Sequence, residues 1–143
     1  MEKQLGAGIQ GVVFSTDAHT AVKAFLRAES YVRERDVYLR LTKLGIDRVS
    51  GFWVPKLVSH HDELLIVEIQ IVSPPFVLDF ASAYLDQPPP YADDEERMAE
   101  WEAEKQEQFE HRWPEVLSLM SEFRAFGIYL SDVKPGNITF ADD

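Results

Sequence analysis

Apolar residues along the first half of the chain occur in short β-prone runs separated by polar turns. Val12–Phe14 and Ala21–Phe25 are two such runs, and they predict the strands of a hairpin. Val54–Val58 and Leu64–Val72 predict a second pair, linked by a polar turn at 60–63. The run at 64–72 is almost continuously apolar, which is typical of a buried central strand.

A helix is predicted between these two pairs of strands. Ser30 is expected to cap it, and Gly45 gives the stop signal after Leu44. One face of this helix carries residues spaced by three, four and three positions, namely Tyr31, Glu34, Tyr38 and Leu41.

The second half is punctuated by prolines and then becomes helical. Pro88–Pro90 marks a linker, and the acidic segment 93–110 predicts a helix with Asp93 as its cap. Another helix is expected to begin near Pro114 and to end at Gly127. Its apolar stripe is expected to contain Trp113, Val116, Leu117, Met120 and Phe123. Strands followed by helices indicate an α+β fold, and 143 residues suit a single domain, 1–143.

Composition narrows the function classes. The net charge is −11, and it is uneven, because residues 1–60 carry nine Lys/Arg against six Asp/Glu while residues 61–143 carry five against nineteen. Such acidity argues against nucleic acid as a partner. No stretch approaches the roughly 20 apolar residues of a membrane span. The chain has no cysteine, which excludes disulfides and thiolate chemistry. We therefore expect a cytoplasmic protein that binds neither nucleic acid nor membrane.

A glycine-rich segment opens the chain, with the pattern Gly6-x-Gly8-x-x-Gly11-x-Val13. Glycines let the backbone approach a phosphate closely and direct N–H groups at it, although many glycine-rich segments are simply turns. Residues typical of strands lie on both sides of this one. That context favours a hairpin over phosphates rather than a dinucleotide-binding turn, which leads into a helix.

Two charged residues are predicted on otherwise apolar surfaces. Lys23 follows Ala21 and Val22 within a strand, so it either extends to water or pairs with an anion. Glu34 lies in the helical stripe, where it either reaches solvent at the stripe's edge or needs a cationic partner. We expect the two side chains to pair with each other.

A polar loop, Asp132-Val133-Lys134-Pro135-Gly136-Asn137, lies between two short apolar runs. Asp132 can accept a hydroxyl proton, Lys134 can neutralise a phosphate, and Asn137 can ligate a magnesium ion. Taken alone, the loop is also compatible with an ordinary turn built on Pro and Gly.

Together and in this order, these motifs resemble the protein-kinase-like superfamily. The resemblance implies an ATP-binding protein and possible phosphotransferase, with ATP and Mg²⁺ as cofactors and Asp132 as the base for a hydroxyl acceptor. It implies a sheet lobe with hinge over 1–87 and a reduced helical lobe over 91–143 that carries the loop. The residues implied to bind nucleotide are Gly6, Gly8, Gly11, Val13, Ala21, Lys23 and Glu34, with the backbone near Glu68 at the hinge. Lys134 is implied to be catalytic, and Asn137 to be the metal ligand.

The chain departs from the family pattern after Asn137. The family continues to a second magnesium-binding aspartate in an Asp-Phe-Gly motif, whereas this chain ends at Ala141-Asp142-Asp143. A carboxylate of Asp142 or Asp143, or one from a partner chain, is expected to replace it if the protein is active. The alternative is a pseudokinase that binds nucleotide without transferring phosphate.

A third possibility is an interaction module with a kinase-like fold, docking a basic protein partner through the acidic helix 93–110. A metal hydrolase is not expected, because the four histidines lack the HExxH spacing, and no nucleophile-elbow signature indicates Ser/His/Asp catalysis.

Overall fold

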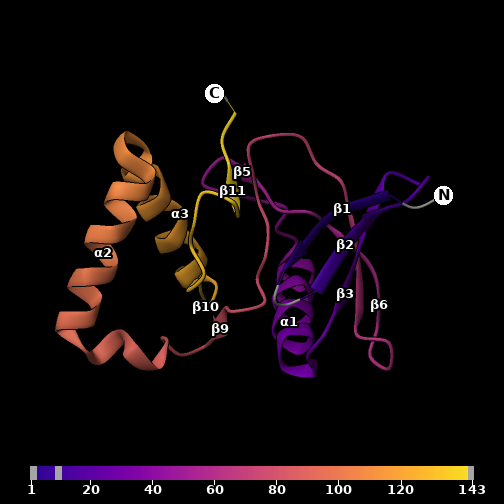
Figure 1. Ribbon diagram of the computed structural model, residues 1–143, viewed down its shortest axis with the longest axis horizontal. Coiled ribbons are helices and arrows are strands. Elements are labelled where there is room, and N and C mark those ends of the chain that lie inside the picture. The colour runs from indigo at the N-terminus through magenta and orange to yellow at the C-terminus, as the bar shows by residue number, and fades with distance from the viewer. Residues whose placement is uncertain (1–2, 9–10, 142–143) are drawn as a thin grey trace.

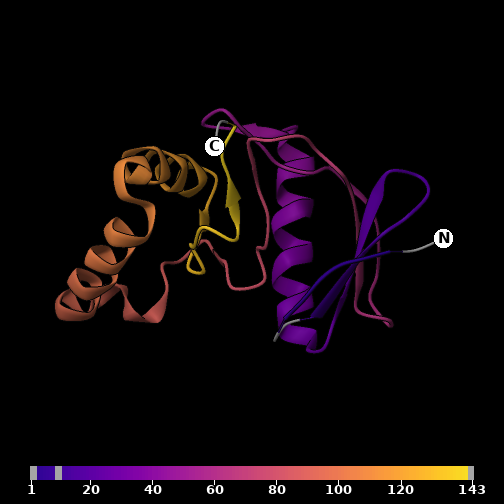
Figure 2. The same ribbon diagram turned by 45° about the horizontal axis from the view of Figure 1, so that its top comes forward.

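The computed structural model describes residues 3–8 and 11–141. Figures 1 and 2 show two groups of elements, a sheet with one long helix and a pair of helices, with several short strands lying between them. The mixed α+β class expected from the sequence is confirmed. In the part of the chain that the structure describes, no helix is long and apolar enough to cross a membrane.

The main sheet has five antiparallel strands in the order β1-β2-β3-β7-β6. Their bounds are β1 (Lys3–Gly8), β2 (Gly11–Ser15), β3 (Thr20–Phe25), β6 (Leu57–His61) and β7 (Ile66–Gln70). The predicted strand 64–72 does lie inside the sheet, between β3 and β6, but it is shorter than expected. The polar turn was predicted too early: His60 and His61 belong to β6, and the turn follows them.

Helix α1 (Ala28–Leu44) covers one face of this sheet (Figure 2). All four residues of the predicted stripe are buried, together with Val37. The helix begins earlier than predicted, so Ser30 lies in its first turn and Arg27 occupies the N-cap without a side-chain hydrogen bond. Gly45 ends it as predicted, in the left-handed conformation with φ 70° that glycine adopts most readily.

A second sheet connects distant parts of the sequence, and the sequence did not predict it as a unit. Its order is β11-β8-β5-β4, formed by the two-residue strands β4 (Arg48–Val49), β5 (Phe52–Trp53), β8 (Phe76–Val77) and β11 (Ile138–Thr139). A separate pair joins β9 (Tyr84–Leu85) to β10 (Ile128–Tyr129). The apolar runs on either side of the Asp132–Asn137 loop therefore pair with the segment 76–85 and not with each other.

The two late helices are α2 (Glu95–Phe109) and α3 (Trp113–Ala125). A short 3-10 helix, η1 (Pro90–Asp93), precedes them, and a second, η2 (Glu110–Arg112), joins them. Asp94, not Asp93, caps α2 by accepting a hydrogen bond from the Arg97 backbone N–H at 3.1 Å. The buried face of α3 contains Leu119, whereas the predicted Leu117 is 42% exposed. Pro114 lies in the first turn of α3 as expected.

Candidate functional site

A cavity of about 1110 Å³ lies between the sheet with α1 on one side and α2 with the Asp132–Asn137 loop on the other. That volume is ample for a nucleotide-sized ligand. Among the residues that line it are Val13, Ala21, Lys23, Glu34, Ile69, Gln70, Ile71, Val72, Asp79, Trp101, Glu104, Asp132, Lys134 and Asn137. Segments that the sequence analysis treated as four separate motifs thus meet around one space.

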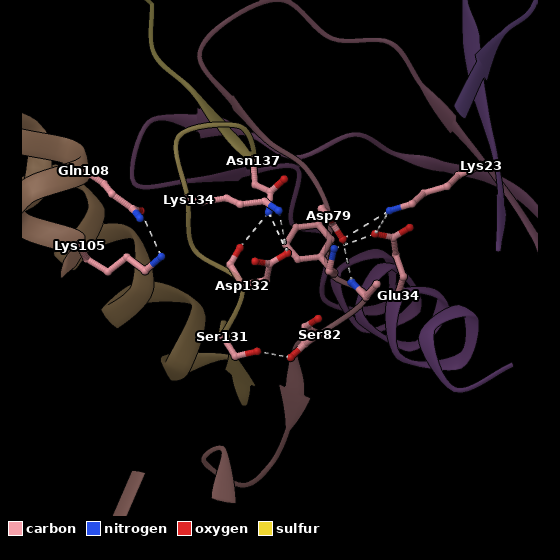
Figure 3. Close-up of polar contacts among 12 residues, drawn as sticks. Lys23, Glu34, Asp79, Ser82, Lys105, Gln108, Ser131, Asp132, Lys134 and Asn137 are labelled. Atoms are coloured by element: carbon pink, nitrogen blue, oxygen red, sulfur yellow. Dashed lines mark hydrogen bonds and ion pairs between the residues drawn. The ribbon is translucent and has the colours of Figure 1, made fainter. Parts of the chain in front are cut away.

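The pair predicted between Lys23 and Glu34 is present (Figure 3). Lys23 Nζ lies 3.2 Å from Glu34 Oε1, and the Glu34 side chain is only 2% exposed. The same carboxylate oxygen accepts a hydrogen bond from the Phe80 backbone N–H at 2.7 Å. Burial raises the pKa of the Glu34 carboxyl above its ordinary value, against the opposing effect of the Lys23 charge. Because Glu34 is held from two sides, it fixes the position of Lys23 at the cavity wall.

Asp79 is a second acidic neighbour of Lys23, and the sequence analysis missed it. Its Oδ1 lies 3.4 Å from Lys23 Nζ and accepts a hydrogen bond from the Ala81 backbone N–H at 3.3 Å. Its φ of 71° is left-handed, a conformation that Asp tolerates better than most residues. A signal was available, because the tripeptide Asp79-Phe80-Ala81 differs only in its last residue from the Asp-Phe-Gly sought beyond Asn137.

The Asp132–Asn137 loop faces the same cavity from the other side. Asn137 Nδ2 donates to the Asp132 backbone oxygen at 2.8 Å and to its Oδ2 at 3.3 Å. Lys134 Nζ lies 3.7 Å from Asp132 Oδ2, and its side chain is half exposed. The Ser131 hydroxyl donates to the Ser82 backbone oxygen, which anchors the start of the loop. The three residues predicted to carry chemistry therefore lie together, with Asp132 in contact with both of the others.

The strand that leads to the expected hinge lines the cavity through Ile69 and Gln70 rather than through the Glu68 side chain. Glu68 is not among the residues that line the cavity. Its carboxylate faces the opposite side of the sheet, where it accepts hydrogen bonds from Thr20 Oγ1 at 2.6 Å and Ser59 Oγ at 3.1 Å. Side chains alternate along a strand, so the next residue, Ile69, faces the cavity instead. The chain leaves the sheet after Gln70, and the segment up to Val72 lines the cavity at the place expected for a hinge.

The glycine-rich segment forms a strand hairpin, as its flanking residues predicted. The backbone of Gly6 pairs with Val13 and that of Gly8 with Gly11, so no helix begins at Gly11. Residues 9 and 10 lie outside the described residues. Val13 and Ala21 line the cavity on the adjacent strands, at the positions expected to contact a nucleotide.

Helix α2 forms the far wall of the cavity, since Trp101 and Glu104 line it. The ring of Trp101 also packs edge-on against Trp113 of α3, with ring centroids 6.0 Å apart. One side of the helix predicted to dock a partner is therefore already occupied within the chain.

The described acidic residues and histidines are spread out rather than gathered into a metal-binding cluster. Within residues 3–8 and 11–141, no group of three or more His, Cys, Asp or Glu is placed to hold a metal ion. Asp142 and Asp143, the tail carboxylates considered from the sequence, lie outside the described residues.

Comparison with known proteins adds little. The chain matches no protein-family model and no curated protein. One solved structure similar to it is the ternary complex of APH(2″)-IIa with streptomycin and ATP. The similarity has a TM-score of 0.40 and 18% sequence identity, over 51% of this chain. It spans 24% of the length of that protein.

Proposed function

We propose that this chain binds ATP with Mg²⁺ in the 1110 Å³ cavity and transfers the γ-phosphoryl group to a hydroxyl acceptor. One observation carries the proposal: Lys23 with its buried partner Glu34 and the loop Asp132–Asn137, distant in sequence, line a single cavity. These residues have the order and types found in protein-kinase-like enzymes.

Nucleotide binding is assigned to the sheet side of the cavity. Lys23 is only 14% exposed, so its charge is weakly screened and acts strongly on a bound phosphate. Val13, Ala21 and Ile69 supply an apolar surface for the base, and the backbone of the segment 70–72, whose residues also line the cavity, is proposed to meet its edge. The glycine hairpin is proposed to cover the phosphates.

The transfer step is assigned to the loop side. The acceptor oxygen bonds to the γ-phosphorus while the bond from that phosphorus to the bridging oxygen breaks, so that ADP leaves with the bond's electrons. Asp132 takes the proton of the acceptor hydroxyl. Lys134 is held near Asp132 and stabilises the charge on the transferring group.

The oxygen-rich donors at the cavity suit Mg²⁺, which is commonly held by one or two side chains together with substrate phosphates. Asn137 fits this role. Its amide nitrogen is committed to Asp132, so its amide oxygen is the atom available to a cation. When bound, the ion would neutralise charge on the phosphates.

The binding half of the proposal is tested by thermal unfolding with ATP and Mg²⁺. ATP at 100 times its Kd should stabilise the protein by about 2.7 kcal/mol, equivalent to a rise in Tm of roughly 8 °C. Lys23→Met should weaken binding ~10- to 100-fold, because a charge-assisted contact is lost. Lys56→Met is the matched control, since Lys56 is 64% exposed and lies outside the cavity lining. No shift for the wild type at millimolar ATP would overturn the proposal.

The transfer half is tested by single-turnover phosphoryl transfer or ATP hydrolysis. Asp132→Asn keeps the side-chain shape but removes the proton acceptor, so the rate should fall ~10²- to 10⁴-fold while ATP affinity stays within about twofold. Asp93→Asn, on an exposed residue away from the cavity, should be silent. If the wild type binds ATP but neither transfers nor hydrolyses it, the pseudokinase alternative is correct.

A further inference from the structure

We propose that Asp79 is the second metal-binding residue of the site and acts with Asn137, so that a segment that precedes the loop in sequence supplies this carboxylate. This inference rests on the proposed function. It replaces the tail carboxylates and the partner chain as sources of that ligand.

Strand register brings Asp79 beside the loop. Strands β8 and β11 are antiparallel, with Val77 opposite Ile138. Continuing this register by one residue places Leu78 opposite Asn137, and the hydrogen bond from the Leu78 N–H to the Asn137 backbone oxygen at 2.9 Å shows that the pairing persists there. Asp79 follows directly, and it lines the cavity together with Leu78.

Its neighbour Phe80 anchors Asp79 in the core. The Phe80 side chain is fully buried, with its ring 5.3 Å from that of Tyr38 on α1 and 5.7 Å from that of Phe123 on α3. The Phe80 N–H donates to Glu34, so ring and backbone hold the residue on two sides. Asp79 therefore projects from a fixed point, which is what a metal ligand requires.

The side chains of Asp79 and Asn137 each have an oxygen that can bind a cation. Both contacts of the Asp79 carboxylate, from Lys23 and from the Ala81 N–H, involve Oδ1. Among residues 3–8 and 11–141, no hydrogen bond or ion pair reaches Asp79 Oδ2 or Asn137 Oδ1. Two hard oxygen donors thus remain unused on the wall of one cavity (Figure 3), a donor set typical of Mg²⁺ sites completed by phosphate oxygens.

If Asp79 is a metal ligand, its charge should affect ATP binding in opposite directions with and without a divalent cation. Without a metal, the Asp79 charge repels ATP phosphates and competes with them for Lys23. With a divalent cation present, the same charge favours the metal–nucleotide complex. A residue with a merely structural role would not affect these two conditions in opposite directions.

The experiment is isothermal titration calorimetry of ATP into the full chain, in EDTA and in MgCl₂, with folding checked by far-UV circular dichroism. For the wild type, Mg²⁺ should strengthen ATP binding. The Mg²⁺-dependent increase in ATP affinity should be at least ~10-fold smaller for Asp79→Asn than for the wild type. The ATP affinity of Asp79→Asn without metal should be unchanged or higher. Asn137→Ala should lose the gain in the same way, and Asp79→Ser serves as the second test if Asp79→Asn does not fold. The double variant Asp142→Asn, Asp143→Asn is the control and should keep the gain.

The two proposals fail in different ways. If Asp79→Asn, or Asp79→Ser in its place, keeps the Mg²⁺-dependent gain, Asp79 is not the ligand and the proposed function stands. If the tail double variant loses the gain and Asp79→Asn does not, the ligand lies in the tail. If the wild type binds no ATP in either condition, both proposals are wrong. Loss of bound Mn²⁺, measured by electron paramagnetic resonance of the Asp79→Asn complex with ATP, would support the assignment independently of turnover.

Discussion

At the scale of single residues, one cation and two anions are in contact with one another at the cavity wall. Lys23 contacts Glu34 and Asp79, and these two carboxylates differ in burial, at 2% and 24% exposure. The buried Glu34 accepts a backbone N–H and holds Lys23 in place, whereas the more open Asp79 makes both of its contacts through Oδ1. Two carboxylates that contact the same lysine thus differ in their surroundings, in burial and in hydrogen bonding.

This difference predicts a pH-dependent stability for Glu34. Its folded-state pKa is raised, chiefly by burial, so its contribution to stability is fully present below the unfolded value near 4.5 and is lost as pH rises through the folded-state pKa. Relative to Glu34→Gln, the wild type should therefore gain stability as pH falls from 7 toward 4.5. Urea unfolding across this range measures the difference, and a difference independent of pH would contradict the prediction.

Much of this residue-level picture followed from the sequence, and the exceptions have physical causes. The Lys23–Glu34 pair was predictable, because a charge on an apolar strand and a charge in a helical stripe each need a partner. Asp79 was not predicted, because the family resemblance places such an aspartate after Asn137. In addition, a two-residue strand such as β8 leaves almost no periodic signal. The direction of the Glu68 side chain did not follow from the sequence, because the alternation of β7, which turns it away from the cavity, depends on register within the sheet.

At the scale of elements, α1 is tied to the second half of the chain by an ion pair. Arg40 Nη1 and Nη2 each lie 2.7 Å from an oxygen of Asp86, which directly follows β9. The Asp86 N–H in turn donates to the Gly127 backbone oxygen at 2.7 Å. Gly127, between α3 and β10, has a φ of 78°, and an added Cβ would come within 2.5 Å of Arg40 Nη1 and 2.6 Å of Asp86 Oδ1.

Gly127→Ala should therefore cost more stability than Gly45→Ala. Both glycines are left-handed, which costs alanine about 1–2 kcal/mol, but Gly45 has nothing within 4 Å of an added Cβ. Gly127→Ala should lower the free energy of unfolding by a further amount of about 0.5–1 kcal/mol, because Arg40 must move away from Asp86. Chemical denaturation measures both. In an Arg40→Ala background the additional cost should disappear, and if it persists, the ion pair is not its cause.

The elements themselves were predicted unevenly. The long helices and the strands of the main sheet carry clear periodicity, and their existence was predicted, with errors at boundaries such as the start of α1. The second sheet was not predicted, because its strands have two residues each and β5 pairs in parallel with a strand more than 20 residues away. Such pairing depends on contacts that no local window of sequence contains.

At the scale of the whole molecule, Phe80 joins the sheet side to the helical side, since its ring contacts both Tyr38 and Phe123. Phe80→Ala should destabilise the protein by about 3–5 kcal/mol and should lower ATP affinity, because Asp79 and the N–H that holds Glu34 shift with it. Leu117→Ala, on an exposed surface, is the control and should change stability by no more than about 0.5 kcal/mol.

The unfolding transition checks the same point. Tryptophan fluorescence reports on Trp53 in β5 and on Trp101 and Trp113 in the helices, and circular dichroism reports on the chain as a whole. Because the core is continuous through Phe80, both signals should change together in the wild type. Separate transitions in the wild type would mean that the two sides fold independently and that Phe80 does not couple them.

The pairing of β11 with β8 has a consequence for the newly made protein. A ribosome adds about 5–20 residues per second, so roughly three to ten seconds separate the synthesis of Asp79 from that of Asp132. During this interval Lys23, Glu34 and Asp79 already exist, while strand β8 still lacks its β11 neighbour. A nascent chain would thus carry the side of the cavity that is proposed to bind nucleotide before the loop with Asp132 has been translated.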